Sequence, residues 1–276
     1  MATCIFRGDA PAVAQVQAWV FGGTWEANDV INCVINGKTV TQITGSTVIA
    51  TLLDTLVTTL NASTIPEFAE VTWSRATSTL SGTADTAGKP FVCTISTTET
   101  GGTAADAQTI DGTTSSAGAS TTACSGPSFW NVAGNWSGAA VPVSTDDVYI
   151  ENTSTPILYG LDNNAVTLTS LTIRKTFTGT IGLPRINGTG TSAYYEYREP
   201  YLKVSATTVN IGTEDGNGSG RIKLNTGTNA TTLNVNGTGS PAEQGLPSLL
   251  WVGVHASNVA NVYSGTVGIA VLAGET

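Results

Sequence analysis

The sequence has few charged residues. Asp, Glu, Lys and Arg make up 11% of its 276 residues, well below the usual quarter. The balance is acidic, with a formal net charge of -9. Such a chain repels the phosphate backbone of nucleic acids, so nucleic acid is not an expected partner. No apolar run approaches the roughly 20 residues needed to cross a bilayer, so no membrane partner is expected either.

The start of the chain lacks two features of a secretion signal. Its first residues have neither a basic segment nor the long apolar core of a signal peptide. We therefore expect the protein to be made in the cytosol.

Cysteine and histidine are also scarce. The four cysteines are widely spread without CxxC spacing, which favours neither a zinc site nor a dense disulfide framework. Cys33 and Cys93 fall on inward strand positions, so we expect small buried thiols. The single histidine, His255, cannot build a histidine metal cluster within one chain, and a structural role is expected for it. The sequence therefore predicts no metal site and no cofactor.

Glycine and threonine, by contrast, are abundant. The chain has 31 Gly and is rich in Thr, Val, Asn and Ser. Thr and Val suit pleated strands, while Gly, Asn and Ser supply turns, so the composition is typical of an all-β protein. The length permits two separate cores.

A short phrase occurs twice in the second half. Residues 206–211 read Ala-Thr-Thr-Val-Asn-Ile, and residues 230–235 read Ala-Thr-Thr-Leu-Asn-Val. Each copy places two apolar residues around one Asn, the alternation of a half-buried strand. Fainter copies occur at 171–173 and 259–262. Because one such strand cannot cover its own apolar face, the repeat predicts neighbouring copies stacked as in a β-solenoid.

The first hundred residues carry different signals. An entering strand is expected within residues 11–24. Two alternating segments, 29–35 and 38–43, are joined by Asn36-Gly37, the strongest short-range hairpin signal. From Ser46 the apolar period changes to that of a helix ending near Leu60. Gly45-Ser46-Thr47 offers the N-cap.

Further strands are expected at 69–74, 78–84 and 91–95. Together with the hairpin they predict a β-sandwich bearing one helix.

This order of elements resembles a module of tailed-bacteriophage virion proteins. The similarity covers the hairpin at Asn36-Gly37, the helix at 47–60 and the segment Ala84–Ile95, with its Thr-Ala-Gly-Lys-Pro-Phe run. The sequence departs from the module's pattern at Asn28, where a Gly is usual, and in a helix rich in Thr rather than Ala. The resemblance implies a sandwich module that attaches the protein to a particle.

Residues 101–127 are rich in Thr, Ala, Ser and Gly and are predicted to form a linker, although their Thr content also allows one edge strand. The segment that follows is similar to the entry segments of β-helical proteins of phage particles and bacterial surfaces. It contains Trp130, Trp136, Pro142 and the run Asp146-Asp147-Val148. The two tryptophans are suited to capping the apolar end of a stack.

A glycan-cleaving enzyme is the main catalytic alternative, because many phage β-helices cleave surface glycans. Acid/base catalysis of that kind needs two carboxyl groups about 5 to 10 Å apart. Asp146 and Asp147 are adjacent in a predicted strand and point to opposite faces. Other carboxylates are scattered among turns (Asp162, Glu196, Glu199, Glu214 and Glu243). A calcium loop at 215–222 is not favoured, since Thr226 stands where the bidentate Glu would be. We expect no enzymatic activity.

Aromatic residues supply the candidate interface. Tyrosines bury large areas at little entropic cost, and an arginine between glutamates can pair across a contact, although the rings can equally pack on their own domain. The candidate interface residues are Tyr194, Tyr195, Tyr197, Arg198, Tyr201, Trp130 and Trp136.

The sequence as a whole predicts a mainly-β, two-domain structural protein. Residues 1–100 are expected to form the β-sandwich, 101–127 the linker and 128–276 a short right-handed β-helix. We expect a virion protein assembled in the host cytoplasm, a capsid decoration protein in contact with other virion proteins and forming a homo-oligomer, with a trimer as the expected state. A tail-attached fibre or baseplate protein, a cell-surface adhesin and a glycan-degrading tailspike remain alternatives.

Overall fold

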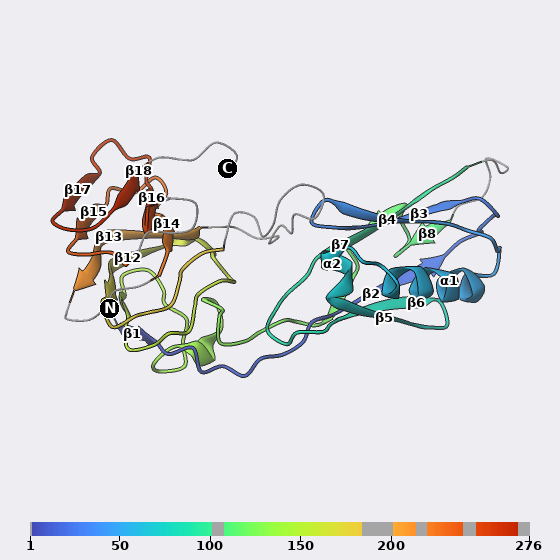
Figure 1. Cartoon of the computed structure of the whole chain (residues 1–276), viewed down its shortest axis with the longest axis horizontal. Helices are drawn as coiled ribbons and strands as arrows, with labels where there is room; N and C mark the ends of the chain where they lie inside the picture. The colour runs from blue at the N-terminus through green and yellow to red at the C-terminus, as the bar shows by residue number, and fades with distance from the viewer. Residues whose placement is uncertain (1, 101–107, 184–200, 214–219, 240–246, 270–276) are drawn as a thin grey trace. The chain divides into compact units, whose positions relative to one another are not determined.

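The structure is a computed structural model that describes residues 2–100, 108–183, 201–213, 220–239 and 247–269 (Figure 1). Strands account for 45% and helices for 9% of the described residues, which confirms the predicted mainly-β class. The described elements, in chain order, are β1 (Thr3–Phe6), β2 (Val16–Gly22), β3 (Val30–Ile35), β4 (Lys38–Ile43), α1 (Ile49–Asn61), α2 (Pro66–Ala69), β5 (Val71–Ala76), β6 (Thr79–Ala84), β7 (Cys93–Thr98), β8 (Thr109–Ile110), β9 (Ser115–Ser116), β10 (Ala119–Thr122), the 3-10 helix η1 (Ala133–Asn135), β11 (Asp147–Ile150), β12 (Asp162–Arg174), β13 (Leu202–Thr213), β14 (Ile222–Asn225), β15 (Thr232–Val235), β16 (Leu249–Val252), β17 (Val259–Val262) and β18 (Val267–Ile269).

The described residues form two compact units. Residues 12–125 make up the first, which we call the two-sheet unit. Residues 2–11 and the described residues from 126 onward make up the second, which we call the stack unit.

The two-sheet unit contains two antiparallel sheets. One has the strand order β10-β2-β6-β5 with β8 beside β2, and the other has the order β4-β3-β7-β9. Both contribute to one apolar core, in which Trp19 stacks on Trp73 with ring centroids 5.8 Å apart. Cys33 and Cys93 are fully buried in it as free thiols, as predicted, and burial raises the pKa of Cys33 to about 12.

The predicted hairpin is confirmed. Strands β3 and β4 pair in antiparallel register from Ile35↔Lys38 to Val30↔Ile43. Asn36 and Gly37 connect them with φ values of 51° and 75°. Both central residues therefore adopt the left-handed conformation that a type I′ turn requires.

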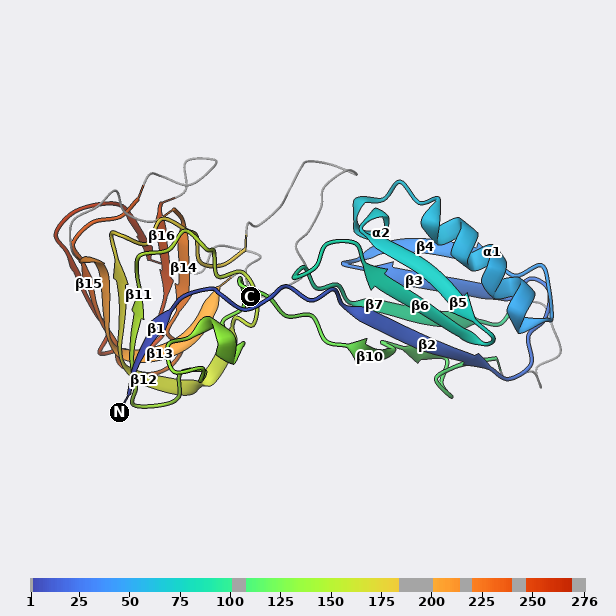
Figure 2. The same ribbon diagram turned by 90° about the horizontal axis from the view of Figure 1, so that it is seen from below.

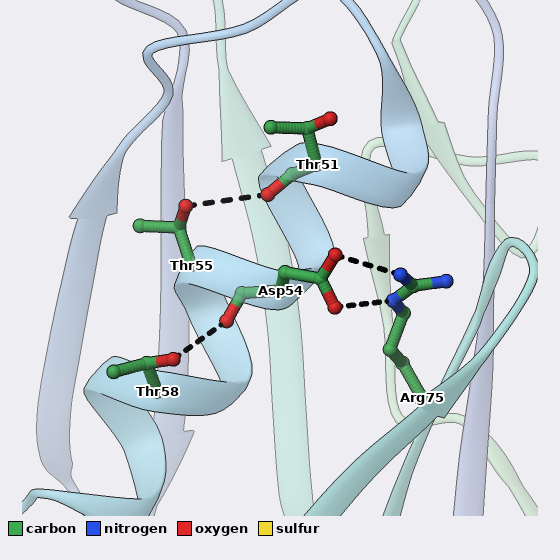
Figure 3. A network of polar contacts seen from close by, with 5 residues as sticks. All are labelled: Thr51, Asp54, Thr55, Thr58 and Arg75. Atoms are coloured by element: carbon green, nitrogen blue, oxygen red, sulfur yellow. Dashed lines mark hydrogen bonds and ion pairs between the residues drawn. The ribbon is translucent and has the colours of Figure 1, made fainter.

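The predicted helix is also confirmed. Helix α1 runs alongside β4 and β5 (Figure 2) and buries four leucines on one face. Its N-cap is Val48 rather than a residue of the predicted Gly45-Ser46-Thr47 cap; the Ser46 hydroxyl instead accepts a hydrogen bond from the Val48 N–H at 3.1 Å. On the exposed face, Arg75 of β5 donates to both oxygens of Asp54, at 2.7 Å each (Figure 3).

The predicted linker differs from the structure. Residues 109–122 form strands β8, β9 and β10, which pair with β2 and β7 at the margins of the two sheets. Threonine and serine are compatible with an edge strand, because one side of such a strand is solvated. They do not give the apolar pattern by which a central strand is recognised in a sequence. The described part of this segment therefore fits the edge-strand alternative, with three strands in place of the one expected, while residues 101–107 lie outside the described residues.

The stack unit is built from parallel ladders. One ladder runs β1, β11, β12, the second half of β13, β15 and β17. Another runs from the start of β13 through β14 and β16 to β18. All these pairs are parallel, and the inward apolar residues form a continuous core that includes Leu171, Val209 and Leu233.

The repeated phrase sets the register of the first ladder. Asn210 lies beside Asn234, with Val209 beside Leu233 and Ile211 beside Val235. The fainter copies join the same columns, at 171–173 on one side and 259–262 on the other. The copies therefore lie side by side in parallel, with corresponding residues paired.

Strand β1 lies in a different unit from the one predicted. The sequence analysis assigned residues 1–100 to one domain, but Thr3–Phe6 pair in parallel with Asp147–Ile150 of β11. The short apolar alternation of β1 carries no signal of which sheet it joins, because its partner follows more than a hundred residues later. Residues 12–125 thus stand, in sequence, between the first two strands of the ladder.

Candidate assembly surface

Four candidate interface residues, Tyr194, Tyr195, Tyr197 and Arg198, lie outside the described residues. The other three are buried within the chain: Trp130 and Trp136 in the core of the stack unit, and Tyr201 beside Leu250 and Val252. These three side chains therefore offer no exposed contact area on the single chain. For Trp130, Trp136 and Tyr201, the aromatic signal therefore identified packing residues.

The two tryptophans cover the end of the stack at which β1 lies. Trp136 packs edge-on against Phe6 of β1 at 5.3 Å and against Trp130 at 4.7 Å. The indole N–H of Trp136 donates to the carbonyl of Trp130 at 2.7 Å. This is the capping arrangement that the sequence suggested, with β1 as the capped strand.

The backbone of β1 is occupied on its outer side as well. The Ser137 N–H donates to the Ile5 carbonyl at 2.8 Å, and the Ile5 N–H donates to the Ser137 hydroxyl at 2.8 Å. The strand therefore has a partner on each side, β11 on one and the Trp136-Ser137 segment on the other.

Asp146 fastens the start of the chain to this end. Its buried carboxylate accepts the Ala2 N–H at 2.7 Å and the Val143 N–H at 3.1 Å, and these backbone hydrogen bonds lower the pKa of Asp146. The neighbouring Asp147 instead accepts from the Ser170 hydroxyl at 2.5 Å. The two carboxylates have separate structural partners, as expected from their adjacent strand positions.

An amide ladder runs along the outward face of the first ladder of strands. The side-chain amide of Asn261 donates to the Oδ1 of Asn234 at 2.9 Å, and that of Asn234 donates to the Oδ1 of Asn210 at 2.9 Å. Asn210 in turn donates to the Thr172 hydroxyl at 3.4 Å. Every donor points toward β12, so the ladder has a direction.

The opposite end of the stack differs from the capped one. Among the described strands β17 is the last of the first ladder, and its Val259, Val262 and the following Tyr263 are 47%, 48% and 71% exposed. From Gly253 to Ile269 the sequence contains no Asp, Glu, Lys or Arg. We call β17 and its exposed side chains the terminal edge.

The terminal edge was not found from the sequence as a site, although its signal was present. Val259-Ala260-Asn261-Val262 was recognised as a copy of the repeated phrase, and the absence of charge around it is visible in the sequence. The sequence does not give the order of the strands. That order determines which copy of the phrase has a neighbour on one side only.

The predicted catalytic candidates can be located where they fall in the described part of the structure. Among the described residues, no three His, Cys, Asp or Glu side chains are grouped closely enough to hold a metal ion. His255 is exposed, and its Nδ1 accepts the Ser257 N–H at 3.0 Å. Of the predicted carboxylates, Asp162 is exposed at the start of β12, while Glu196, Glu199, Glu214 and Glu243 lie outside the described residues, as does most of the 215–222 segment. None of the described helices is long and apolar enough to span a membrane.

Comparisons with protein-family models, curated proteins and solved structures give no match for this chain.

Proposed function

We propose that this chain is a non-enzymatic structural component of a tailed-phage particle, in which the two-sheet unit is a β-sandwich and the stack unit is a short right-handed β-helix. Capsid decoration is the favoured role, with attachment to the tail as the alternative. The observation that carries the proposal is the terminal edge, an uncharged, partly apolar strand left exposed in a chain with a net charge of -9.

Exposed edge strands are ready-made templates for pairing, and natural proteins blunt them with charges, proline or a covering segment. The capped end follows that rule through Trp136 and Ser137. The terminal edge does not, which supports a role in assembly.

Several described polar side chains of the stack unit are also engaged in structural hydrogen bonds. The asparagines bind one another, Asp146 binds backbone N–H groups and Asp147 binds Ser170. Carboxylates that act on glycans need a free pair across a cleft. This arrangement supports scaffolding rather than catalysis.

Fractionation of particles tests the proposal. Particles from a culture that makes the chain are purified on a density gradient, and the chain is followed by mass spectrometry and immunogold electron microscopy. We expect it in the particle fraction at a fixed ratio to the major capsid protein, with gold over the head. An abundant host cytosolic protein serves as the control for carry-over.

Gold over the tail would replace decoration with the tail alternative. Recovery of the chain only in the soluble or outer-membrane fraction would overturn the particle assignment. Cleavage of acidic oligosaccharides by the purified chain, measured by reducing-end release, would overturn the non-enzymatic part.

A further inference from the structure

Alternate backbone N–H groups along β17 and at the residue that follows it donate hydrogen bonds to β15 or the residue before it. The Val259 N–H donates to the Thr231 carbonyl at 3.0 Å, and the Tyr263 N–H donates to the Val235 carbonyl at 2.8 Å. In a parallel ladder, alternate residues direct their N–H and C=O to opposite neighbours. Ala260 and Val262 therefore present theirs away from β15, on the open side of the strand.

The amide ladder also ends at β17, and it leaves a hydrogen-bond acceptor on the open side of that strand. Asn261 uses its side-chain N–H to reach Asn234, so its Oδ1 is the acceptor at the open end of the ladder. A strand added there completes the ladder when it brings a side-chain amide donor to that position. A hydroxyl donor satisfies the same acceptor.

The inward columns also stop at the terminal edge. Ala260 continues the column of Leu233, and Val262 continues that of Val235. Leu233 and Val235 are fully buried, whereas Ala260 is exposed and Val262 is 48% exposed. A further strand with apolar residues on both sides of its amide would bury both positions.

We infer that β17 accepts one further parallel strand from a partner protein, and that this strand is uncharged and carries an Asn, or another side-chain donor, between two apolar residues. Binding by strand addition takes its affinity from main-chain hydrogen bonds and its specificity from alternate side chains. The inference rests on the proposed function, since a neighbouring particle protein would supply the strand.

A second copy of the chain fits this edge poorly. Head-to-tail stacking would need the outer side of β1, which Ser137 already occupies. A two-fold pairing of β17 centred on Asn261 would be antiparallel and would set two Oδ1 acceptors against each other. A parallel donor strand meets neither obstacle.

The test uses the full chain labelled with ¹⁵N and a synthetic peptide of residues 229–236 with blocked ends, which reproduces the β15 strand. Amide hydrogen exchange is followed by NMR. In the free chain we expect fast exchange at Ala260 and Val262 and slow exchange at Asn261, whose N–H faces β15. Saturating peptide should slow exchange at Ala260 and Val262 at least tenfold and leave Asn261 unchanged.

Two N-methylated peptides provide matched controls without altering the protein. In β15 the Asn236 N–H donates to the Ile211 carbonyl at 2.9 Å, so the N–H groups of Thr232, Asn234 and Asn236 face the preceding strand. Methylation of the Asn234 nitrogen should weaken binding at least tenfold. Methylation of the Leu233 nitrogen should leave binding within about twofold.

Three results would overturn the inference. Slow exchange at Ala260 and Val262 in the free chain would show that the chain itself or a second copy covers the edge. Binding that leaves these amides unprotected would show that the peptide binds elsewhere on the chain. No binding at millimolar peptide would show that β17 does not accept a further strand. Each of these outcomes leaves the particle fractionation unaffected, so the failure of this inference is distinguishable from failure of the proposed function.

Discussion

The two-sheet unit and the stack unit set their strand registers in different ways. In the two-sheet unit β3 and β4 are consecutive and share a two-residue turn, so Asn36 and Gly37 fix which residues pair. In the stack unit consecutive neighbours of the first ladder are separated by long segments, and columns of asparagines flanked by apolar residues mark the register instead. The strand register is therefore set by a local turn in the two-sheet hairpin and by the repeated sequence in the stack unit.

The difference extends to the edges. The stack unit has a direction, with a tryptophan-covered β1 at one end and the exposed β17 at the other. The amide ladder runs in one direction between these ends, because the Asn261 and Asn234 donors both point toward β12. The predictions below test how far the two units differ, beginning with the largest expected effect.

The largest effect is expected from matched core truncations. Leu233 of β15 and Leu80 of β6 are both fully buried, so Leu233→Ala and Leu80→Ala should each cost roughly 3 kcal/mol of unfolding free energy. Because the two residues lie in separate cores, calorimetry should show each variant lowering a different transition. A single transition lowered equally by both would mean that the units unfold together.

A glycine pair comes next. Gly37 and Gly212 both have positive φ, 75° and 79°, but a Cβ at Gly37 would touch nothing within 4 Å, whereas one at Gly212 would lie 2.1 Å from the Gly237 carbonyl oxygen. Gly37→Ala should cost about 1 kcal/mol, from strain alone. Gly212→Ala should cost a further 1 to 3 kcal/mol, about the range for overpacking, because two backbones must separate.

Chemical denaturation of both variants measures this difference. Equal losses would contradict the close packing of the segments around Gly212 and Gly237.

Asp146 should affect only the stack unit. Asp146→Asn removes the charge that holds the Ala2 and Val143 N–H groups, at a cost of about 2 kcal/mol. Because the folded-state pKa of Asp146 is lowered, its contribution is present above the unfolded value near about 3.9 and is lost as the pH falls through the folded value.

Urea unfolding between neutral and acidic pH checks the sign. The wild-type chain should lose stability more steeply in acid than Asp146→Asn does. Parallel pH profiles for the two proteins would contradict the assigned role of the carboxylate.

The smallest effect is expected at the exposed pair Asp54 and Arg75. The Arg75 guanidinium lowers the pKa of Asp54, but the Asp54 side chain is 61% exposed and the pair is open to salt. Asp54→Asn should give a small fall in melting temperature at low salt that disappears at about 1 M NaCl, where the Debye length is about 3 Å. A fall that persists in salt would indicate that the hydrogen-bond geometry matters more than the charge.

The elements that sequence analysis predicted well are those with strong local signals. The hairpin at Asn36-Gly37 and the leucine stripe of α1 each follow from a few neighbouring residues. The stacking of 206–211 on 230–235 followed from the repeat, because identical phrases favour identical positions in successive layers.

The elements that were missed depend on distant partners. Nothing in Thr3–Phe6 indicates that it pairs with β11, and the serines and threonines of β9 and β10 resemble a linker until β7 and β2 are placed beside them. The burial of Tyr201 likewise depends on Leu250 and Val252, which follow much later in the chain.

The position of β1 also has a consequence for biosynthesis. Residues 3–6 are made well before their partner β11, which is complete only after residue 150 has been added, when all of residues 12–125 have been synthesised. The entropic penalty for closing so long a loop grows only logarithmically with its length, so the delay weighs more on folding kinetics than on stability. Strand β1 must therefore remain without its β11 partner while residues 7–150 are synthesised.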